Sequence, residues 1–300
     1  MDWIYFVLIS SFIWSVTSLI DKIIISKGYI KNPLVYLLSN GFMNVLIVFV
    51  LPFAGFGPLK FADFLIALLS GAAFSAALAI YYKSVQFDEI SKIVILFQLG
   101  PVFVLALSFL FLGEALTKIH LIGFLFLIGA GVIVSYKKDK KSKKSFKLSR
   151  AFYYMLASMF LSSVALVTSK HIFNVTDFWS AFIWLRMADF CALGVMIVPS
   201  IRKDALNTLN SMKPKIKALL AFKMVIDFSA FLFLGYAILK GPLSIITALG
   251  SSILPLFVFL LASAASLYFP NIVKEEISKK ALLVKLFAVL LVIIGIVLVS

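Results

Sequence analysis

Long apolar stretches alternate with short polar breaks along the whole chain of 300 residues. The apolar stretches are continuous and lack the strict alternation of apolar and polar positions that a half-buried strand shows, so they favour helices over strands. Most reach about 20 residues, the length at which a helix crosses the hydrocarbon core of a bilayer. The pattern predicts ten transmembrane helices, at residues 3–20, 33–55, 61–82, 91–112, 116–136, 151–169, 178–199, 216–239, 242–269 and 281–299.

The longest polar break divides the predicted helices into two equal groups. It reads KKDKKSKKSFKLSR and spans residues 137–150. A run of this composition is typical of a solvated tether, and its positive charge also helps to set the orientation of neighbouring helices. We therefore expect a first five-helix repeat at 1–136, a basic linker loop at 137–150 and a second five-helix repeat at 151–300.

Composition agrees with a membrane protein. Apolar residues make up 63% of the chain, whereas soluble domains contain roughly 45–50%. The net charge of +15 lies mostly between the apolar stretches, where it is explained by lipid head groups rather than by nucleic acid. We expect a multi-pass protein of the cell membrane, either monomer or homodimer. The single Cys and two His residues have no metal-site spacing, so neither metal nor cofactor is expected.

The two halves of the chain repeat one another. Tyr82 precedes Pro101 by the same number of residues as Tyr236 precedes Pro255, and both prolines fall inside predicted helices. Because each half has an odd number of helices, two copies joined head to tail must enter the membrane in opposite directions. The predicted fold is an all-α membrane protein in which ten transmembrane helices form two inverted five-helix repeats, with a shared site near the midplane.

A looser parallel joins the first two helices of each half. IDKIIISKGYIKNPLVYLLSN in the first half parallels TSKHIFNVTDFWSAFIWLR in the second. In this alignment Lys22 corresponds to Lys170, and Asn40 falls near Arg186.

The first half also carries a family pattern. It consists of a Tyr-Tyr helix end, a proline inside the next helix, a Leu-Gly-Glu turn and a Gly-rich fifth helix: Tyr81, Tyr82, Pro101, Leu112, Gly113, Glu114, Gly123, Gly129 and Gly131. This pattern resembles the EamA-type repeat of the drug/metabolite transporter superfamily. In the second half Tyr236, Pro255 and Gly295 match, but the acidic turn is displaced to Glu275–Glu276. The resemblance implies a ten-helix carrier of metabolites or drugs.

The positive charges predict an orientation. Most of the 28 Lys and Arg residues lie in the odd-numbered connections between predicted helices. The positive-inside rule then places those connections in the cytoplasm and both termini outside. Members of the resembled family are generally drawn with both termini inside, and we follow the charge distribution.

Two charged pairs lie within predicted helices. Arg186 and Asp189 are three residues apart, and Lys223 and Asp227 are four apart, so each pair shares one helix face. A charge at the centre of a membrane helix costs about 2.5–3.5 kcal/mol on insertion scales, so such residues normally face the protein interior or a wet cavity. Each pair either neutralises itself and stabilises packing, or contributes to a substrate cavity in which an acid titrates.

The prolines indicate where such a cavity lies. Pro101 and Pro255 lack a backbone donor, which frees the carbonyls of Phe97 and Ser251 and predicts a kink. Freed carbonyls are tolerated in a membrane only where protein or water satisfies them. Tyr82 and Tyr236 are either cavity donors or interfacial aromatics. The predicted substrate-binding residues are Tyr82, Gln98, Pro101, Arg186, Asp189, Asp227, Tyr236, Thr247, Ser251, Ser252 and Pro255.

The function favoured by the sequence is secondary active transport by alternating access. The cargo would be a small metabolite, an amino acid or a drug-like compound, with proton coupling as a further option. The alternative is a membrane channel or a scaffold subunit that transports nothing. An enzyme is not expected, because no nucleophile–base pair, His-rich face or P-loop is found.

Overall fold

The computed structural model describes residues 3–88, 90–112, 118–119, 122–123, 125–126, 129, 133, 136–138, 146–241, 243–268 and 279–299. Within these ranges the chain is predominantly helical. The predicted helix at 116–136 and the Leu-Gly-Glu turn lie largely outside the described residues, as does the displaced acidic turn at Glu275–Glu276.

The first half consists of helices with two 3-10 interruptions. Its elements are α1 (Trp3–Ser26), α2 (Pro33–Met43), η1 (Asn44–Phe49), η2 (Leu51–Phe53), α3 (Phe61–Ser84), α4 (Ile90–Ile95), η3 (Leu96–Gln98) and α5 (Leu99–Leu112). Asn32 caps α2 by accepting a hydrogen bond from the Leu34 amide, and Pro33 occupies the first turn, where no amide donor is needed.

The second half begins with a short hairpin and continues as helices. Its elements are β1 (Tyr136–Lys138), β2 (Phe146–Leu148), α7 (Arg150–Val175), α8 (Phe178–Ala188), η4 (Asp189–Ile197), α9 (Pro199–Ser211), α10 (Pro214–Lys240), α11 (Leu243–Tyr268) and α12 (Lys279–Val299). Ser149 caps α7, and Asp177 caps α8 through the amides of Trp179 and Ser180.

Several helices have the length and composition of membrane spans. In the described part of the chain, five elements or element pairs qualify: Trp3–Ser26, Phe61–Ser84, Arg150–Val175, Phe178–Ile197 and Pro214–Lys240. Large apolar side chains such as Phe12, Phe111, Phe160 and Leu260 point outward. An outer surface of this kind is suited to lipid rather than to water.

Two features differ from the sequence expectation. Strands were not expected, yet β1 and β2 pair antiparallel, with Tyr136 opposite Leu148, so part of the predicted linker loop is a hairpin. Main-chain hydrogen bonds form such a short ladder without any apolar alternation. The helix α9 was also missed, because it is polar, has no buried residue and so contains no apolar run.

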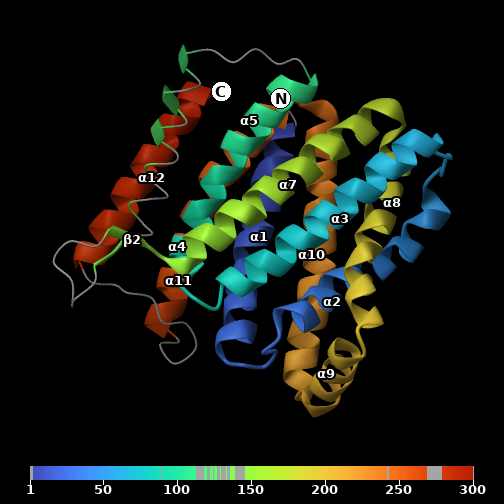
Figure 1. The fold of residues 1–300 in the computed structure, drawn as a ribbon, viewed down its shortest axis with the longest axis horizontal. Coiled ribbons are helices and arrows are strands. Elements are labelled where there is room, and N and C mark those ends of the chain that lie inside the picture. Colours follow the sequence, from blue (N-terminus) through green and yellow to red (C-terminus); the bar gives the residue numbers. More distant parts are fainter. Residues whose placement is uncertain are drawn as a thin grey trace.

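Helices of the two halves pack against each other rather than forming separate bodies. α3 packs on α7, and α1 packs on α10 and α11 (Figure 1). One apolar cluster, which includes Tyr36, Tyr82 and Met155, lies toward the α1–α2 connection. Another, which includes Phe173 and Phe182, lies toward the α7–α8 connection. The space between these two clusters holds the candidate site.

Candidate functional site

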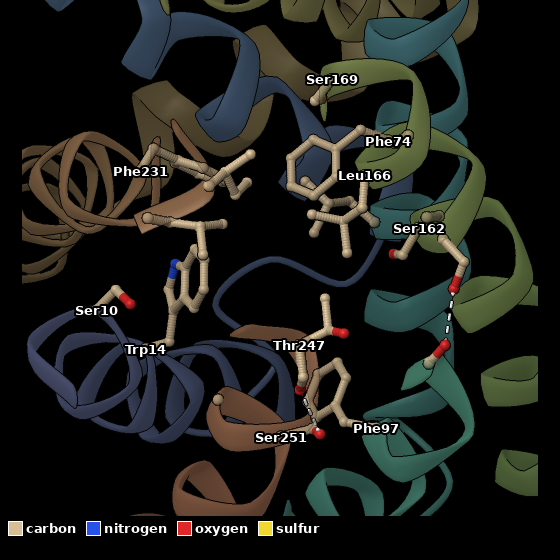
Figure 2. Close-up of a pocket in the computed structure, with 18 of the residues that line it drawn as sticks. Ser10, Trp14, Phe74, Phe97, Ser162, Leu166, Ser169, Phe231, Thr247 and Ser251 are labelled. Atoms are coloured by element: carbon tan, nitrogen blue, oxygen red, sulfur yellow. Dashed lines mark hydrogen bonds between the residues drawn. The ribbon is translucent and has the colours of Figure 1, made fainter. Parts of the chain in front are cut away.

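A cavity of about 290 Å³ lies between the two halves of the chain. Its walls come from α1, α2, α3, η3, α5, α7, α8, η4, α10 and α11. Figure 2 shows side chains of several of these helices converging on the same open space. Its volume lies just below the range for small-molecule sites, about 300–1,000 Å³.

Hydroxyl groups line the cavity from both halves. On α1 and α7 they recur at helical spacing, so each helix presents one polar stripe: Ser10, Ser11, Thr17, Ser18, Ser158, Ser162, Ser163 and Ser169. Many of these hydroxyls already donate to backbone carbonyls, as Ser158 does to Ala77 at 2.8 Å. Their remaining lone pairs can accept hydrogen bonds, so this surface favours a ligand group that donates them.

Aromatic rings form an apolar section of the wall. Phe231 of α10 meets the rings of Trp14 and Phe74 edge to face, at 5.4 Å in each case. All three residues line the cavity (Figure 2). The cavity therefore offers an apolar contact surface next to its hydroxyl groups.

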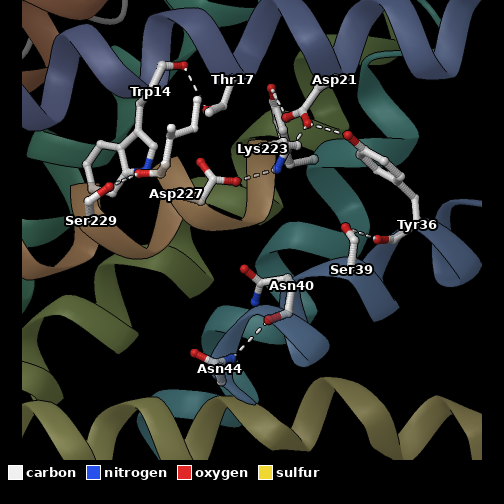
Figure 3. Close-up of polar contacts among 12 residues, drawn as sticks. Trp14, Thr17, Asp21, Tyr36, Ser39, Asn40, Asn44, Lys223, Asp227 and Ser229 are labelled. Atoms are coloured by element: carbon white, nitrogen blue, oxygen red, sulfur yellow. Dashed lines mark hydrogen bonds and ion pairs between the residues drawn. The ribbon is translucent and has the colours of Figure 1, made fainter. Parts of the chain in front are cut away.

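A buried charged cluster bounds the cavity toward the α1–α2 connection. Lys223 Nζ lies 2.5 Å from Asp227 Oδ2 and 3.3 Å from Asp21 Oδ1. The hydroxyls of Tyr36 and Tyr81 donate to Asp21, at 2.6 and 3.3 Å (Figure 3 shows the bond from Tyr36). The cluster joins α1 to α10, and with both carboxylates ionised it carries one net negative charge.

The second charged pair stands on α8 and η4. Arg186 Nη1 lies 2.7 Å from Asp189 Oδ2, and both residues are buried. The guanidinium lies over the Phe231 ring, 4.1 Å from its centroid, as a cation–π contact. The ionic contact is not aligned as a hydrogen bond. In the described part of the chain Nε and Nη1 have no hydrogen-bond partner.

Most of the described side chains among the predicted substrate-binding residues come together. The cavity is lined by Tyr82, Pro101, Arg186, Asp189, Asp227, Thr247 and Ser251. Tyr236 does not share this position: its ring stacks on Phe178, with centroids 3.9 Å apart, and it is not among the described lining residues. The side chains of Gln98, Ser252 and Pro255 lie outside the described part of the structure.

The two prolines stand in different local structures. The helix containing Pro101 is interrupted just before it by η3, whereas α11 runs as a continuous α-helix through position 255. Near the first proline, the Ser163 hydroxyl donates to the Gly100 carbonyl at 3.1 Å. The Ser251 hydroxyl donates to the Thr247 carbonyl at 2.6 Å. The two prolines correspond in sequence, but the helix is interrupted next to Pro101 and is not interrupted at Pro255.

Sequence reasoning missed Asp21 and the two hydroxyl stripes. A signal was present, because Val7, Ser11, Trp14, Ser18 and Asp21 follow helical spacing along one face of α1. The apolar residues between these positions mask the polar face in the overall hydrophobicity of the stretch. The partner of Asp21, Lys223, is about two hundred residues away in sequence, so no local pattern links them. No metal-binding group of three or more His, Cys, Asp or Glu residues occurs in the part described.

Comparisons with known proteins agree with this architecture. A search of curated protein sequences returned no match. One solved structure, described as "Crystal structure of protein", is 17% identical with a TM-score of 0.65, over 100% of this chain and 96% of that chain. At this identity the likeness shows the fold alone. The model of the EamA-like transporter family matches residues 1–136. With its apolar helices the chain is an integral membrane protein, and residues 1–136 are similar to the EamA-like transporter family.

Proposed function

We propose that the protein is a secondary active transporter that moves a small solute by alternating access. The observation that carries this proposal is the cavity between the two halves, into which Arg186, Asp189, Lys223 and Asp227 bring charge at buried positions. Charges are costly inside a membrane protein and normally mark a pathway for a solute or an ion. The family match over residues 1–136 supports the same function.

The proposed architecture is ten transmembrane helices in two inverted repeats. Lys22 near the end of α1 donates to the carbonyls of Val85 and Asp88, after the end of α3. Lys170 near the end of α7 donates to the carbonyls of Ile238 and Gly241, at the end of α10. Lysines at equivalent positions of the two halves thus bind the ends of equivalent helices, as expected if a two-fold axis relates the halves.

The packing of the helices supports the same two-fold relation between the halves. α3 packs on α7, and its counterpart α10 packs on α1; α1 packs on α11, and its counterpart α7 packs on α5. These paired interfaces are what two copies related by a two-fold axis in the membrane plane would form. Such symmetry makes the two ends of the cavity chemically alike, so either end can open while the other stays closed.

Apolar clusters on either side of the cavity supply the two closures. One contains the fully buried rings of Tyr36 and Tyr82, and the other contains Phe173 and Phe182. In the proposed cycle one cluster separates at a time, which exposes the cavity to one side of the membrane. A channel would need both to open together, and the packed rings at both ends favour the carrier.

Counterflow in proteoliposomes tests the proposal. Purified protein is reconstituted with an unlabelled solute inside, and the same labelled solute is added outside. A carrier accumulates label transiently above equilibrium, because exchange is faster than net efflux. Equilibration without overshoot would indicate a channel, and no flux for any member of a broad metabolite library would support a scaffold subunit.

Proton coupling is the finer part of this proposal. Three acids line the cavity, Asp21, Asp189 and Asp227, and an acid that exchanges a proton during the cycle makes transport depend on pH. Asp189→Asn and Asp227→Asn are expected to weaken that dependence. If both variants, and Asp21→Asn as well, keep the uptake and the pH profile of the unmodified protein, coupling through these acids is wrong.

A further inference from the structure

The unusual feature of the cavity is a set of buried donors without acceptors. Arg186 is 8% exposed, and its Nε has no hydrogen-bond partner in the described part of the structure, whereas its Nη1 makes the ionic contact with Asp189. Asn40, which is 6% exposed and also lines the cavity, has an unpartnered Nδ2. The hydroxyls nearby differ, since Ser70 and Ser158 donate to backbone carbonyls. Buried donors of this kind are normally satisfied, so these call for an acceptor from outside the chain.

The fold brings these donors to one region of the cavity. Gly41, next to Asn40 on α2, packs so closely on η4 that a Cβ placed on it would lie 2.5 Å from Leu193 Cδ2 and 3.4 Å from Ala192 Cβ. Ala192 follows Asp189 by one turn of η4. Asn40 of α2 and the Arg186–Asp189 pair of α8 and η4 line the same cavity, and α2 packs directly against η4. Figure 3 shows Asn40 with its side-chain amide free of any drawn bond, below the Lys223 cluster.

We propose that the cargo carries a carboxylate group, which binds to the Nε edge of Arg186 and to Asn40. The inference rests on the proposed function, and it names the chemical class of the solute. A guanidinium presents its donors in a plane that matches the two oxygens of a carboxylate. Its contact with the Phe231 ring fixes that plane. Asp189 occupies Nη1, so the Nε edge is the one offered to the ligand.

The charges in the cavity favour a carboxylate over a phosphate. Arg186 and Lys223 are the lining cations of the described residues, against Asp21, Asp189 and Asp227. Lys223 is held between two carboxylates and Arg186 is paired with Asp189 through Nη1, so the Nε edge of Arg186 is the part of these cations left to meet an anion. With all three acids ionised these lining residues carry one net negative charge, so a doubly charged phosphate would add twice the excess negative charge that a singly charged carboxylate adds.

The remaining cavity wall suits an apolar body attached to this group. Phe231 contacts both the guanidinium and the rings of Trp14 and Phe74. An aryl or alkyl carboxylate would place its charged end at Arg186 and its apolar end along these rings. Phenylpropionate is therefore a suitable probe, and phenylpropanamide is its neutral match of nearly equal shape.

Binding to the purified full-length protein in detergent tests the proposal without requiring transport. Calorimetry and thermal shift are expected to show phenylpropionate binding at least about tenfold more tightly than phenylpropanamide, since hydrogen bonds to a charged group are lost in the amide. Phenylalanine, tested alongside, shows whether an added amino group strengthens binding. Equal binding of acid and amide, or binding of inorganic phosphate in preference to phenylpropionate, would overturn the proposal.

Two cavity variants and one matched control locate the binding group. Arg186→Lys keeps the charge beside Asp189 but removes the Nε donor, and it should weaken phenylpropionate binding about tenfold. Asn40→Ala should weaken it severalfold, and this variant serves as the test should Arg186→Lys not fold. Arg202→Lys, on the exposed surface of α9, should bind as the unmodified protein does. Unchanged affinity in a folded Arg186→Lys or Asn40→Ala variant would contradict the assignment.

The result of these binding experiments can be distinguished from the result of the counterflow experiment. Carboxylate binding with no counterflow of any solute would overturn transport and retain the binding site. Counterflow of neutral or cationic solutes alone, without carboxylate binding, would retain transport and overturn the carboxylate assignment.

Discussion

Gly71 of α3 lies directly against the backbone of Ala188 at the end of α8. A Cβ placed on Gly71 would be 2.3 Å from both the carbonyl carbon and the carbonyl oxygen of Ala188. No side-chain rotation can relieve such a contact, because the obstructing atoms belong to a helix backbone. Ala188 lies between Arg186 and Asp189 in sequence, so this contact fixes the position of the charged pair in the cavity.

Gly71→Ala is expected to destabilise the protein by about 1–3 kcal/mol, the usual cost of overpacking. It should also weaken ligand binding at Arg186, because α8 must move outward. Thermal unfolding in detergent measures the first effect and calorimetry the second. Gly194→Ala is the matched control: no atom lies within 4 Å of the added Cβ, so its stability should be unchanged or slightly higher. Equal stability of the two variants would show that the helices separate without cost.

Lys223 holds two carboxylates, and its loss should cost more than the loss of either acid. Lys223→Met leaves Asp21 and Asp227 buried without their cation, for which about 3–5 kcal/mol is expected. Asp21→Asn keeps the contact between Lys223 and Asp227 and should cost clearly less. Thermal melts of the two variants measure the order, with Lys217→Met on the exposed face of α10 as the control. The reverse order would mean that the cluster is held chiefly by Asp21 and its tyrosines.

Asp177 stabilises the start of α8 as its N-cap. Its Oδ1 accepts hydrogen bonds from the amides of Trp179 and Ser180, at 3.0 and 3.1 Å. The hydrogen bond with the Ser180 side chain, followed by those from the two amides, lowers the pKa of Asp177. Asp177→Ala should therefore cost about 1 kcal/mol at neutral pH, whereas Asp177→Ser should retain most of the stability.

The effect of Asp177 on stability should depend on pH. Because its pKa is lowered on folding, its ionic contribution is complete above the unfolded pKa of about 3.9 and is lost as pH falls through the folded value. The difference in melting temperature between the unmodified protein and Asp177→Ala should narrow below about pH 4. A difference that stays constant through this range would mean that the cap acts without its charge.

Orientation can be tested because the two ends of the chain lie together. Figure 1 places the N and C labels at one end of the molecule and the α1–α2 connection and α9 at the other. The excess of Lys and Arg in the odd-numbered connections, which include that between α1 and α2, predicts that this other end is cytoplasmic. A C-terminal fusion to a reporter that works only outside the cytoplasm should be active. Activity of a cytoplasmic reporter there would reverse the orientation.

The helical spans could be predicted from sequence because hydrophobic length is a local property. Every predicted span outside 116–136 corresponds to described helices, in some cases with a 3-10 continuation such as η1 or η4. The polar helix α9 and the hairpin were missed, because neither depends on burying an apolar run. The close approach of α3 to α8 occurs at Gly71, where the absence of a side chain permits it.

Sequence alone determined the class of the protein, the repeated pattern and the pairs Arg186–Asp189 and Lys223–Asp227, since residues three or four apart on a helix must share a face. Only the tertiary structure decided which of these side chains share one cavity, that Asp21 joins Lys223, and that Tyr236 packs on Phe178. The reason is physical. Helical periodicity fixes the direction of a side chain relative to its own axis, whereas its neighbours depend on how the helices cross, and close contacts such as that of Gly71 with Ala188 set those crossings.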